Sequence, residues 1–173
     1  MAILAIRVYP DPVLRVKCPP VTEFDAALRK LAADMVETMH AAPGVGLAAP
    51  QVGVELRLAV VDVSVGEDPS QVRVLVNPEV VERAGGLESE VEGCLSLPGI
   101  SDKVERPLLV TVRAQDVDGR PFELEAEGYY ARAVCHEIDH LDGILFTDHL
   151  RGLRRERARR QLKKLADELQ VHA

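Results

Sequence analysis

The chain has 173 residues, 47% of them hydrophobic and 28% charged, and a formal net charge of −7 at pH 7. This length and hydrophobic content fit one domain with its own core, so a single domain over residues 1–173 is expected. Three cysteines without paired spacing, and no apolar run long enough for a signal peptide or a membrane span, exclude a secreted disulfide scaffold and a membrane protein and favour the cytoplasm.

The first predicted element is a helix that Thr22 can cap and that ends before Pro43-Gly44. Its apolar residues recur at helical spacing and fall on one side of the helix: Phe24, Leu28, Leu31, Met35 and Met39. This pattern predicts a helix that packs on the core along one face.

The segment GVGLAAPQ, residues 44–51, follows this helix and contains two glycines, which permit close approaches that other residues forbid. It is too apolar for a phosphate loop and lacks the Lys and Ser/Thr of a P-loop. If the segment binds anything, its backbone would lie near a peptide-like ligand and Gln51 would supply a neutral amide donor. Taken alone, a tight connection with a surface glutamine is the simpler interpretation.

Strands are predicted over four runs: Leu56–Val63, Val72–Val76, Leu108–Ala114 and Phe122–Ala126. The last two pair across a turn that contains Asp118-Gly119, and another strand is expected directly before the turn at Gly93. Helices placed among antiparallel strands predict an α+β fold, with antiparallel sheets packed around a central helix over the HEIDH motif and a further helix at the C-terminus.

The motif HEIDH, residues 136–140, lies in a predicted helix. The residues before it contain no proline, and apolar side chains recur at three- and four-residue steps: Ala131, Val134, Ile138 and Leu141. Gly143 is expected to end the helix in a left-handed conformation. A helix puts both histidines on one face, which makes a clamp for a divalent metal, and Glu137 can reach a water on that metal without being a ligand.

Two histidines leave a catalytic metal site one protein ligand short. The metzincin pattern fails because Phe146 stands where a third histidine is required, and Glu156 and Glu168 lie in a basic segment that favours solvent. Cys94, in the glycine-containing turn EGCLSLP, offers a thiolate that could complete the site, although a free cysteine is most often a small buried residue. For Cys18 and Cys135 the role of a small buried residue is preferred.

The C-terminal region is the basic exception in an acidic chain. Residues 151–164 contain eight Lys or Arg and one Glu, a net charge of +7, which leaves −14 for the rest. Leucines at helical spacing predict a basic C-terminal helix over residues 151–169, packed along one edge. Its basic face is either simply solvated or contacts RNA. With only 3% aromatic residues, an RNA contact would be made to phosphates rather than by base stacking.

Three segments in this order, GVGLAAPQ, EGCLS and HEIDH, resemble the signature motifs of peptide deformylases. Residues 9–15, YPDPVLR, are also similar to the N-terminal stretch of that family, and the resemblance covers residues 3 to 165. It implies an enzyme that removes the formyl group from the N-terminal formyl-methionine of newly synthesised proteins and releases formate. Chance agreement of three ordered motifs is negligible compared with that of one.

The resemblance also implies roles for individual residues. It makes Cys94, His136 and His140 the metal ligands and Glu137 the general base and acid, while Gln51 and the backbone N–H of Leu95 stabilise the oxyanion. Candidates for contact with the substrate, including a methionine pocket, are Val45, Gly46, Gly93, Leu95, Tyr129 and Ala133. Arg132 stands where many relatives are expected to have an apolar residue, so a more polar pocket rim is expected.

The resemblance implies iron(II) as the physiological metal, with zinc, nickel or cobalt as other occupants, although zinc would bind more tightly by the Irving–Williams order. An iron-bound thiolate implies sensitivity to oxygen. The expected partners are formyl-methionyl nascent polypeptides and, through the basic helix, the ribosome. No membrane and no sequence-specific nucleic acid partner is expected.

Two other function classes remain open at the level of sequence. A broader HExxH metallopeptidase would cleave internal peptide bonds, but Phe146 and the upstream Cys94 disfavour it. A non-catalytic metal-binding or sensor protein would not need Glu137, which is neither a ligand nor an obvious packing residue. The remaining histidines, His40, His149 and His172, show no partner pattern and are expected to be surface or structural residues.

Overall fold

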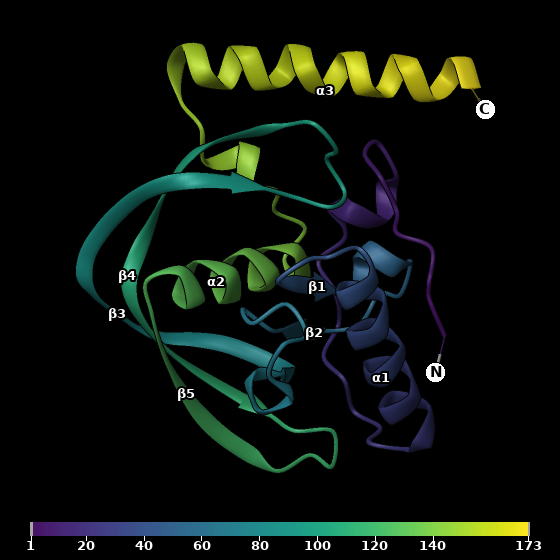
Figure 1. Cartoon of the computed structure of the whole chain (residues 1–173), viewed down its shortest axis with the longest axis vertical. Helices are drawn as coiled ribbons and strands as arrows, with labels where there is room; N and C mark the ends of the chain where they lie inside the picture. The colour runs from purple at the N-terminus through teal and green to yellow at the C-terminus, as the bar shows by residue number, and fades with distance from the viewer. Residues whose placement is uncertain (1, 173) are drawn as a thin grey trace.

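The computed structural model describes residues 2–172, with the side chains of residues 2–170, and is shown in Figure 1. Its helices are α1 (Ala26–Ala41), α2 (Tyr129–Leu141) and α3 (Gly152–His172). Its strands are β1 (Gly46–Ala48), β2 (Leu58–Val61), β3 (Arg73–Gly93), β4 (Ser101–Gln115) and β5 (Pro121–Glu127). Short 3-10 turns occupy Pro12–Arg15, Ala49–Val52, Pro69–Gln71 and Phe146–His149.

The strands form one antiparallel sheet in the order β1-β2-β3-β4-β5. The β3–β4 hairpin is long and strongly curved, and it bends around α2 (Figure 1). Its register shifts three times, between Val76 and Glu79, between Val80 and Glu82, and between Ala84 and Leu87. Such bulges bend a strand and increase its twist, so one sheet can enclose the helix. The predicted α+β fold is confirmed, with one continuous sheet where several were expected.

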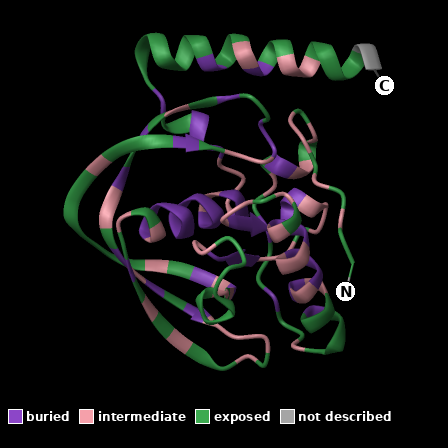
Figure 2. Ribbon diagram, viewed as in Figure 1, coloured by how far each residue is buried: buried purple, intermediate pink, exposed green. Residues whose placement is uncertain are grey.

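Helix α2 lies at the centre of this arrangement, and Figure 2 shows that it is buried along most of its length. Its apolar residues, including Ala131, Val134 and Ile138, pack against the sheet residues Leu75, Val110, Val112 and Ala126. The helix ends as the sequence predicts, because Gly143 follows it with a φ of 73°. A side chain at Gly143 would also lie 2.6 Å from the backbone oxygen of Arg15.

Helix α1 begins later than the sequence predicts. Thr22 does not cap it; the carboxylate of Asp25 accepts the backbone N–H of Leu28 at 3.0 Å and starts the helix three residues further on. The buried side of α1 carries Leu28, Met35 and Met39, as expected from their spacing, whereas Phe24 and Leu31 are half-buried.

Two strand boundaries differ from the predicted ones. Strand β2 covers only Leu58–Val61, because the carboxylate of Asp62 accepts the backbone N–H groups of Ser64 and Gly66 and starts a turn. Strand β3 is far longer than the predicted 72–76, since it continues through its bulges to the strand expected before Gly93. Strands β4 and β5 contain the predicted 108–114 and 122–126, joined by the expected turn.

Helix α3 lies along one edge of the molecule and is exposed over most of its surface (Figures 1 and 2). Ala158 and Leu162 are buried and pack with Leu14, Phe146 and Leu150. The predicted basic C-terminal helix is therefore present and docked along one edge. No helix among the described residues is long and apolar enough to cross a membrane.

Candidate metal centre

Three side chains from two separate segments converge at one point. His136 and His140 are one turn apart on α2, and Cys94 lies in the turn that follows β3. The Nε2 atoms of the two histidines are 3.2 Å apart, and the Sγ of Cys94 lies 3.3 Å from Nε2 of His140. Their ligand atoms all lie within 4.8 Å of one another.

These separations fit a bound metal ion. Ligand atoms held tetrahedrally about 2.0–2.3 Å from a metal are about 3.3–3.6 Å apart, close to the separations seen here. The set of two imidazoles and one thiol suits zinc or another first-row transition metal and not magnesium or calcium, which prefer oxygen ligands. The three residues therefore form a site that can hold a divalent transition metal.

A buried carboxylate supports His136 from behind. Oε1 of Glu92 lies 2.8 Å from Nδ1 of His136, so the imidazole can donate there and leave the lone pair of Nε2 for a metal. Arg106 binds both oxygens of Glu92, at 2.8 and 2.9 Å, and Arg132 binds Oε2 at 2.7 Å. Burial alone would raise the pKa of Glu92, but the bonds from Arg106 and His136 outweigh it and lower that pKa.

Glu137 points toward the same site without joining the ligand set. It is only 4% exposed, and its Oε2 is buried with no hydrogen-bond partner in the described part of the chain. Burial raises the pKa of Glu137 to about 7, against the lowering effect of His136. A carboxyl whose pKa lies near neutrality can both accept and return a proton.

The position of Glu137 depends on a close approach by strand β1. A Cβ at Gly46 would lie 2.6 Å from Oε1 of Glu137, so only glycine leaves room for the carboxylate. This explains one of the two glycines in the 44–51 segment. The segment lies at the site and is more than a tight connection.

Gln51 is fully buried and its amide is fixed at both ends. Its Oε1 accepts the backbone N–H of Ala48 at 2.9 Å, and its Nε2 donates to Oγ of Ser96 at 3.1 Å and lies 3.7 Å from Sγ of Cys94. Because the amide oxygen is taken by a backbone donor, the amide NH₂ must face the cysteine. In the described chain the backbone N–H of the neighbouring Leu95 has no acceptor.

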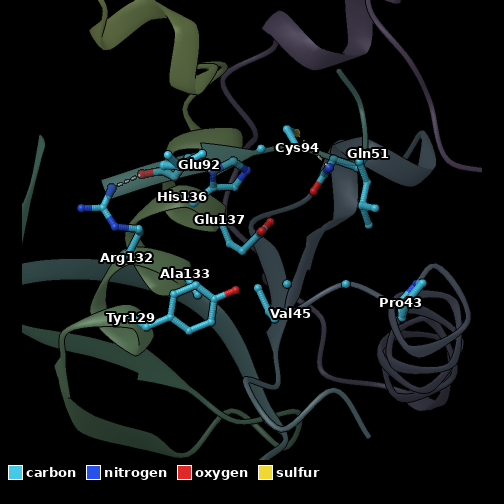
Figure 3. A pocket seen from close by; sticks show the side chains of 15 residues that line it. Pro43, Val45, Gln51, Glu92, Cys94, Tyr129, Arg132, Ala133, His136 and Glu137 are labelled. Carbon is cyan, nitrogen blue, oxygen red and sulfur yellow. Dashed lines mark hydrogen bonds and ion pairs between the residues drawn. The ribbon is translucent and has the colours of Figure 1, made fainter. Parts of the chain in front are cut away.

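A cavity of about 340 Å³ opens beside these groups, and Figure 3 shows its walls. Gln51, Cys94, His136 and Glu137 line this cavity. So do all the residues predicted to contact the substrate, which are Val45, Gly46, Gly93, Leu95, Tyr129 and Ala133. Four further lining residues were not predicted from the sequence: Pro43, Gly44, Val91 and Glu92. Glu92, the first residue of EGCLS, carried no sequence signal for its role, because its burial depends on how the β3–β4 hairpin folds over α2.

The expectation for Arg132 needs correction. Arg132 contributes to the cavity wall, but its guanidinium is turned toward Glu92 (Figure 3). The residue as a whole is only 4% exposed. Besides Glu92 it binds the backbone oxygens of Glu88 and Val104, both at 2.7 Å. The charge is therefore neutralised behind the site, and it does not make the pocket rim more polar.

The other positions considered for a third ligand do not reach the metal centre. Phe146 is buried and its ring stacks on His136 at a centroid distance of 6.2 Å. Glu156 and Glu168 are exposed on α3. Cys18 and Cys135 are buried, and burial raises the pKa of the Cys135 thiol to about 11, so both behave as small core residues.

The remaining histidines are structural where they are described. Nε2 of His40 lies 2.7 Å from Asp62, and Nε2 of His149 lies 2.8 Å from Asp139. The side chain of His172 lies outside the described residues. Neither His40 nor His149 is part of the metal centre.

A helix that presents two histidines and an intervening glutamate to one point, beside a cavity and within an α+β fold, defines an HExxH metallohydrolase. A thiol as the third candidate ligand, together with a buried carboxylate behind His136, sets this site apart from HExxH enzymes whose third ligand is His or Glu. Residues 3–156 match the family described as Polypeptide deformylase, and the chain belongs to this family of enzymes.

Individual relatives agree with this assignment. The chain is 52% identical over 172 residues to a peptide deformylase of Alkalilimnicola ehrlichii, covering 99% of this chain and 96% of the relative. It is 49% identical to that of Pseudomonas aeruginosa over 164 residues, 95% of this chain and 96% of the relative. A crystal structure of a peptide deformylase from Legionella pneumophila superposes with a TM-score of 0.88 at 47% identity and 99% coverage of both chains.

Proposed function

We propose that this enzyme hydrolyses the N-terminal formyl group of formyl-methionyl polypeptides newly made by the ribosome and releases formate. The observation that carries the proposal is the convergence of Cys94, His136 and His140 beside the buried carboxylate of Glu137, at a cavity in a member of the deformylase family. Family membership disfavours a general metallopeptidase and a non-catalytic metal-binding protein.

Cys94, His136 and His140 would hold one divalent ion, and we propose iron(II), with zinc, nickel or cobalt able to occupy the same donors. When bound, such an ion lowers the pKa of water from about 15.7 toward roughly 7 and polarises a carbonyl oxygen. Glu92 supports this chemistry by fixing the orientation of the His136 ring.

Glu137 moves the proton in this proposal. It accepts a proton from the water that attacks the formyl carbon, and it donates that proton to the amine nitrogen as the C–N bond breaks. Formate and a free N-terminal amine result. Its pKa of about 7 and its unpartnered Oε2 suit both steps, because no other group in the described chain competes for that oxygen.

Gln51 and Leu95 stabilise the negative charge that develops on the former carbonyl oxygen. The Nε2 of Gln51 faces Cys94, and the second donor is the backbone N–H of Leu95, the residue directly after Cys94. Donors fixed before the reaction act mainly in the transition state, and each is worth about 3 kcal/mol. Ser96 and Ala48 hold the Gln51 amide in this orientation.

The cavity accepts the methionine side chain and the start of the peptide. At about 340 Å³ it is of a size typical of small-ligand sites. Val45, Tyr129 and Ala133 provide apolar wall, while Gly46 and Gly93 allow the peptide backbone to approach. We further propose that residues 1–173 act as one catalytic domain in the cytoplasm and that basic helix α3 contacts the ribosome.

Formate release tests the proposed activity. We expect the iron-loaded protein, assayed without oxygen, to release formate from a formyl-methionyl peptide and to leave the acetylated analogue intact. Release of internal fragments from an unformylated peptide would instead identify a metallopeptidase. Metal binding with no turnover of either peptide would identify a binding protein.

A further inference from the structure

Val91 connects the metal-centre cavity to a second groove. Its side chain is 57% exposed and lines both the cavity and a depression of about 660 Å³ between the β3–β4 hairpin and α3. On the α3 side, Leu153 is 88% exposed at the rim of the same depression. We call this depression the α3 groove.

The α3 groove is strongly basic. Four cationic side chains line it, Lys103 from β4 and Arg154, Arg157 and Arg160 from α3, against the single carboxylate of Asp102, which gives a net charge of +3. Asp102 binds Arg157 at 3.0 Å and lies 3.8 Å from Arg154. Lys103 and Arg160 form no ion pair with any described residue.

The groove residues occupy one flank of α3 only. Leu153, Arg154, Arg157 and Arg160 follow each other at helical spacing, and the docked edge of the helix carries Ala158 and Leu162. The other flank carries Arg155, Arg159 and Lys163, which line a separate depression beside Tyr9 and Arg15. The same helix therefore offers two basic surfaces, of which only one shares a residue with the metal-centre cavity.

We propose that the α3 groove binds the part of the substrate polypeptide that follows the formyl-methionine, and that it favours acidic residues there. This inference rests on the proposed deformylation, because the formyl group must lie at the metal centre while the rest of the chain leaves past Val91. Two exposed apolar side chains beside unpaired cations suit an extended peptide with mixed apolar and acidic residues. Ribosomal RNA would also neutralise the charge, but RNA binding does not explain why the groove shares Val91 with the metal-centre cavity.

The distance along β3 sets which substrate residues reach the groove. Val91 precedes the ligand Cys94 by three residues, which in an extended strand is about 10 Å. A substrate in extended conformation covers that distance in about three residues, so the groove begins near its fourth residue. A formylated tripeptide reaches the metal centre but not the groove.

Peptide length and charge test this proposal in the metal-loaded enzyme. The substrates are a formyl-Met tripeptide and two nine-residue formyl-Met peptides that carry either Asp and Glu or Ser at residues four to seven. We expect KM for the acidic peptide to be about three- to tenfold lower than for the serine peptide at low salt, with kcat unchanged and with the preference lost at high salt. Equal KM values at low salt would overturn the proposal.

Two double variants with the same change in charge locate the effect. Lys103→Gln with Arg160→Gln should remove most of the acidic preference, whereas Arg159→Gln with Lys163→Gln, on the other flank of α3, should keep it. Loss in both variants would show a long-range charge effect and contradict a local groove. Tripeptide turnover serves as the internal reference, because its absence would reject deformylation itself. If the wild type shows no preference for the acidic peptide, and only the Lys103→Gln, Arg160→Gln variant loses binding to ribosomes, the groove binds RNA and the proposal is wrong.

Discussion

His136 owes its orientation to a carboxylate that is not a ligand. Glu92 accepts from its Nδ1 and is itself held by Arg106 and Arg132, so the ring is fixed before any metal binds. A fixed ring loses less conformational entropy on binding, which favours metal affinity. Cys94 has no comparable support from a carboxylate, and its Sγ lies 3.3 Å from Nε2 of His140 and 3.7 Å from Nε2 of Gln51.

Replacing the thiol tests the ligand assignment. Cys94→Ser should weaken metal retention by roughly tenfold or more, because a neutral hydroxyl replaces a thiolate. Metal analysis after dialysis measures this, with Cys135→Ser as the matched control, since Cys135 is one residue from His136 and buried away from the ligand atoms. Equal metal loss from both variants would overturn the assignment of Cys94.

Individual site residues could be predicted from the sequence where their role depends on spacing along one helix. The histidines one turn apart, and Glu137 between them, follow from helical geometry, and their placement on α2 is observed. The roles of Arg132 and Glu92 could not be predicted in the same way, because their partners are 14 to 44 residues distant along the chain. Such pairings depend on how the hairpin folds over the helix.

Among the elements, β1 and α2 approach so closely that one methyl group matters. A Cβ at Gly46 would lie 2.6 Å from the Glu137 carboxylate, which must then move. We expect Gly46→Ala to retain the metal and to lower kcat by up to about 10²-fold, because misplacement of a reacting group by about 1 Å has effects of that size.

Gly44→Ala is the matched control. A Cβ at Gly44 would meet the flexible end of Leu95 at 3.0 Å, which can adjust with little effect on the carboxylate. Steady-state kinetics with a formylated tripeptide, with metal content measured in parallel, compares the two variants. If Gly46→Ala is as active as Gly44→Ala, the close approach has no role in positioning Glu137.

The elements themselves were predicted unevenly. Helix α2 was predicted well because its apolar spacing and Gly143 act locally. The extent of β3 was not predicted, because most of its residues between 77 and 92 are exposed and its bulges interrupt the alternation on which strand prediction depends. Its curvature belongs to the hairpin as a whole, and that curvature brings Glu92 and Cys94 to the helix.

Over the whole molecule, charge is segregated. Residues 151–164 carry +7 within a chain of net charge −7, and α3 displays that charge on an exposed surface. The buried Ala158 and Leu162 explain why the helix docks, but they do not explain the charge. Contact with ribosomal phosphates is the proposed reason for the charge outside the α3 groove, on the flank that carries Arg155, Arg159 and Lys163.

Salt dependence tests the ribosome contact. Because phosphate contacts release counterions, binding to ribosomes should fall steeply with salt. Replacing Arg154, Arg155 and Arg159 by Glu should weaken co-sedimentation with ribosomes at low salt and leave deformylation of a short peptide nearly unchanged. Co-sedimentation that is absent at low salt, or unaffected by the triple substitution, would leave the basic face as a solvated surface.

The central claim is that Glu137 performs proton transfer at a metal held by Cys94, His136 and His140. Glu137→Gln keeps the size of the side chain and removes its basicity, so the variant should bind metal normally and lose about 10²- to 10⁴-fold in the rate of formate release. The decisive measurement is single-turnover formate release by wild type and Glu137→Gln at equal, measured metal content. A variant rate within about threefold of wild type would contradict the claim, since general acid–base assistance is worth far more.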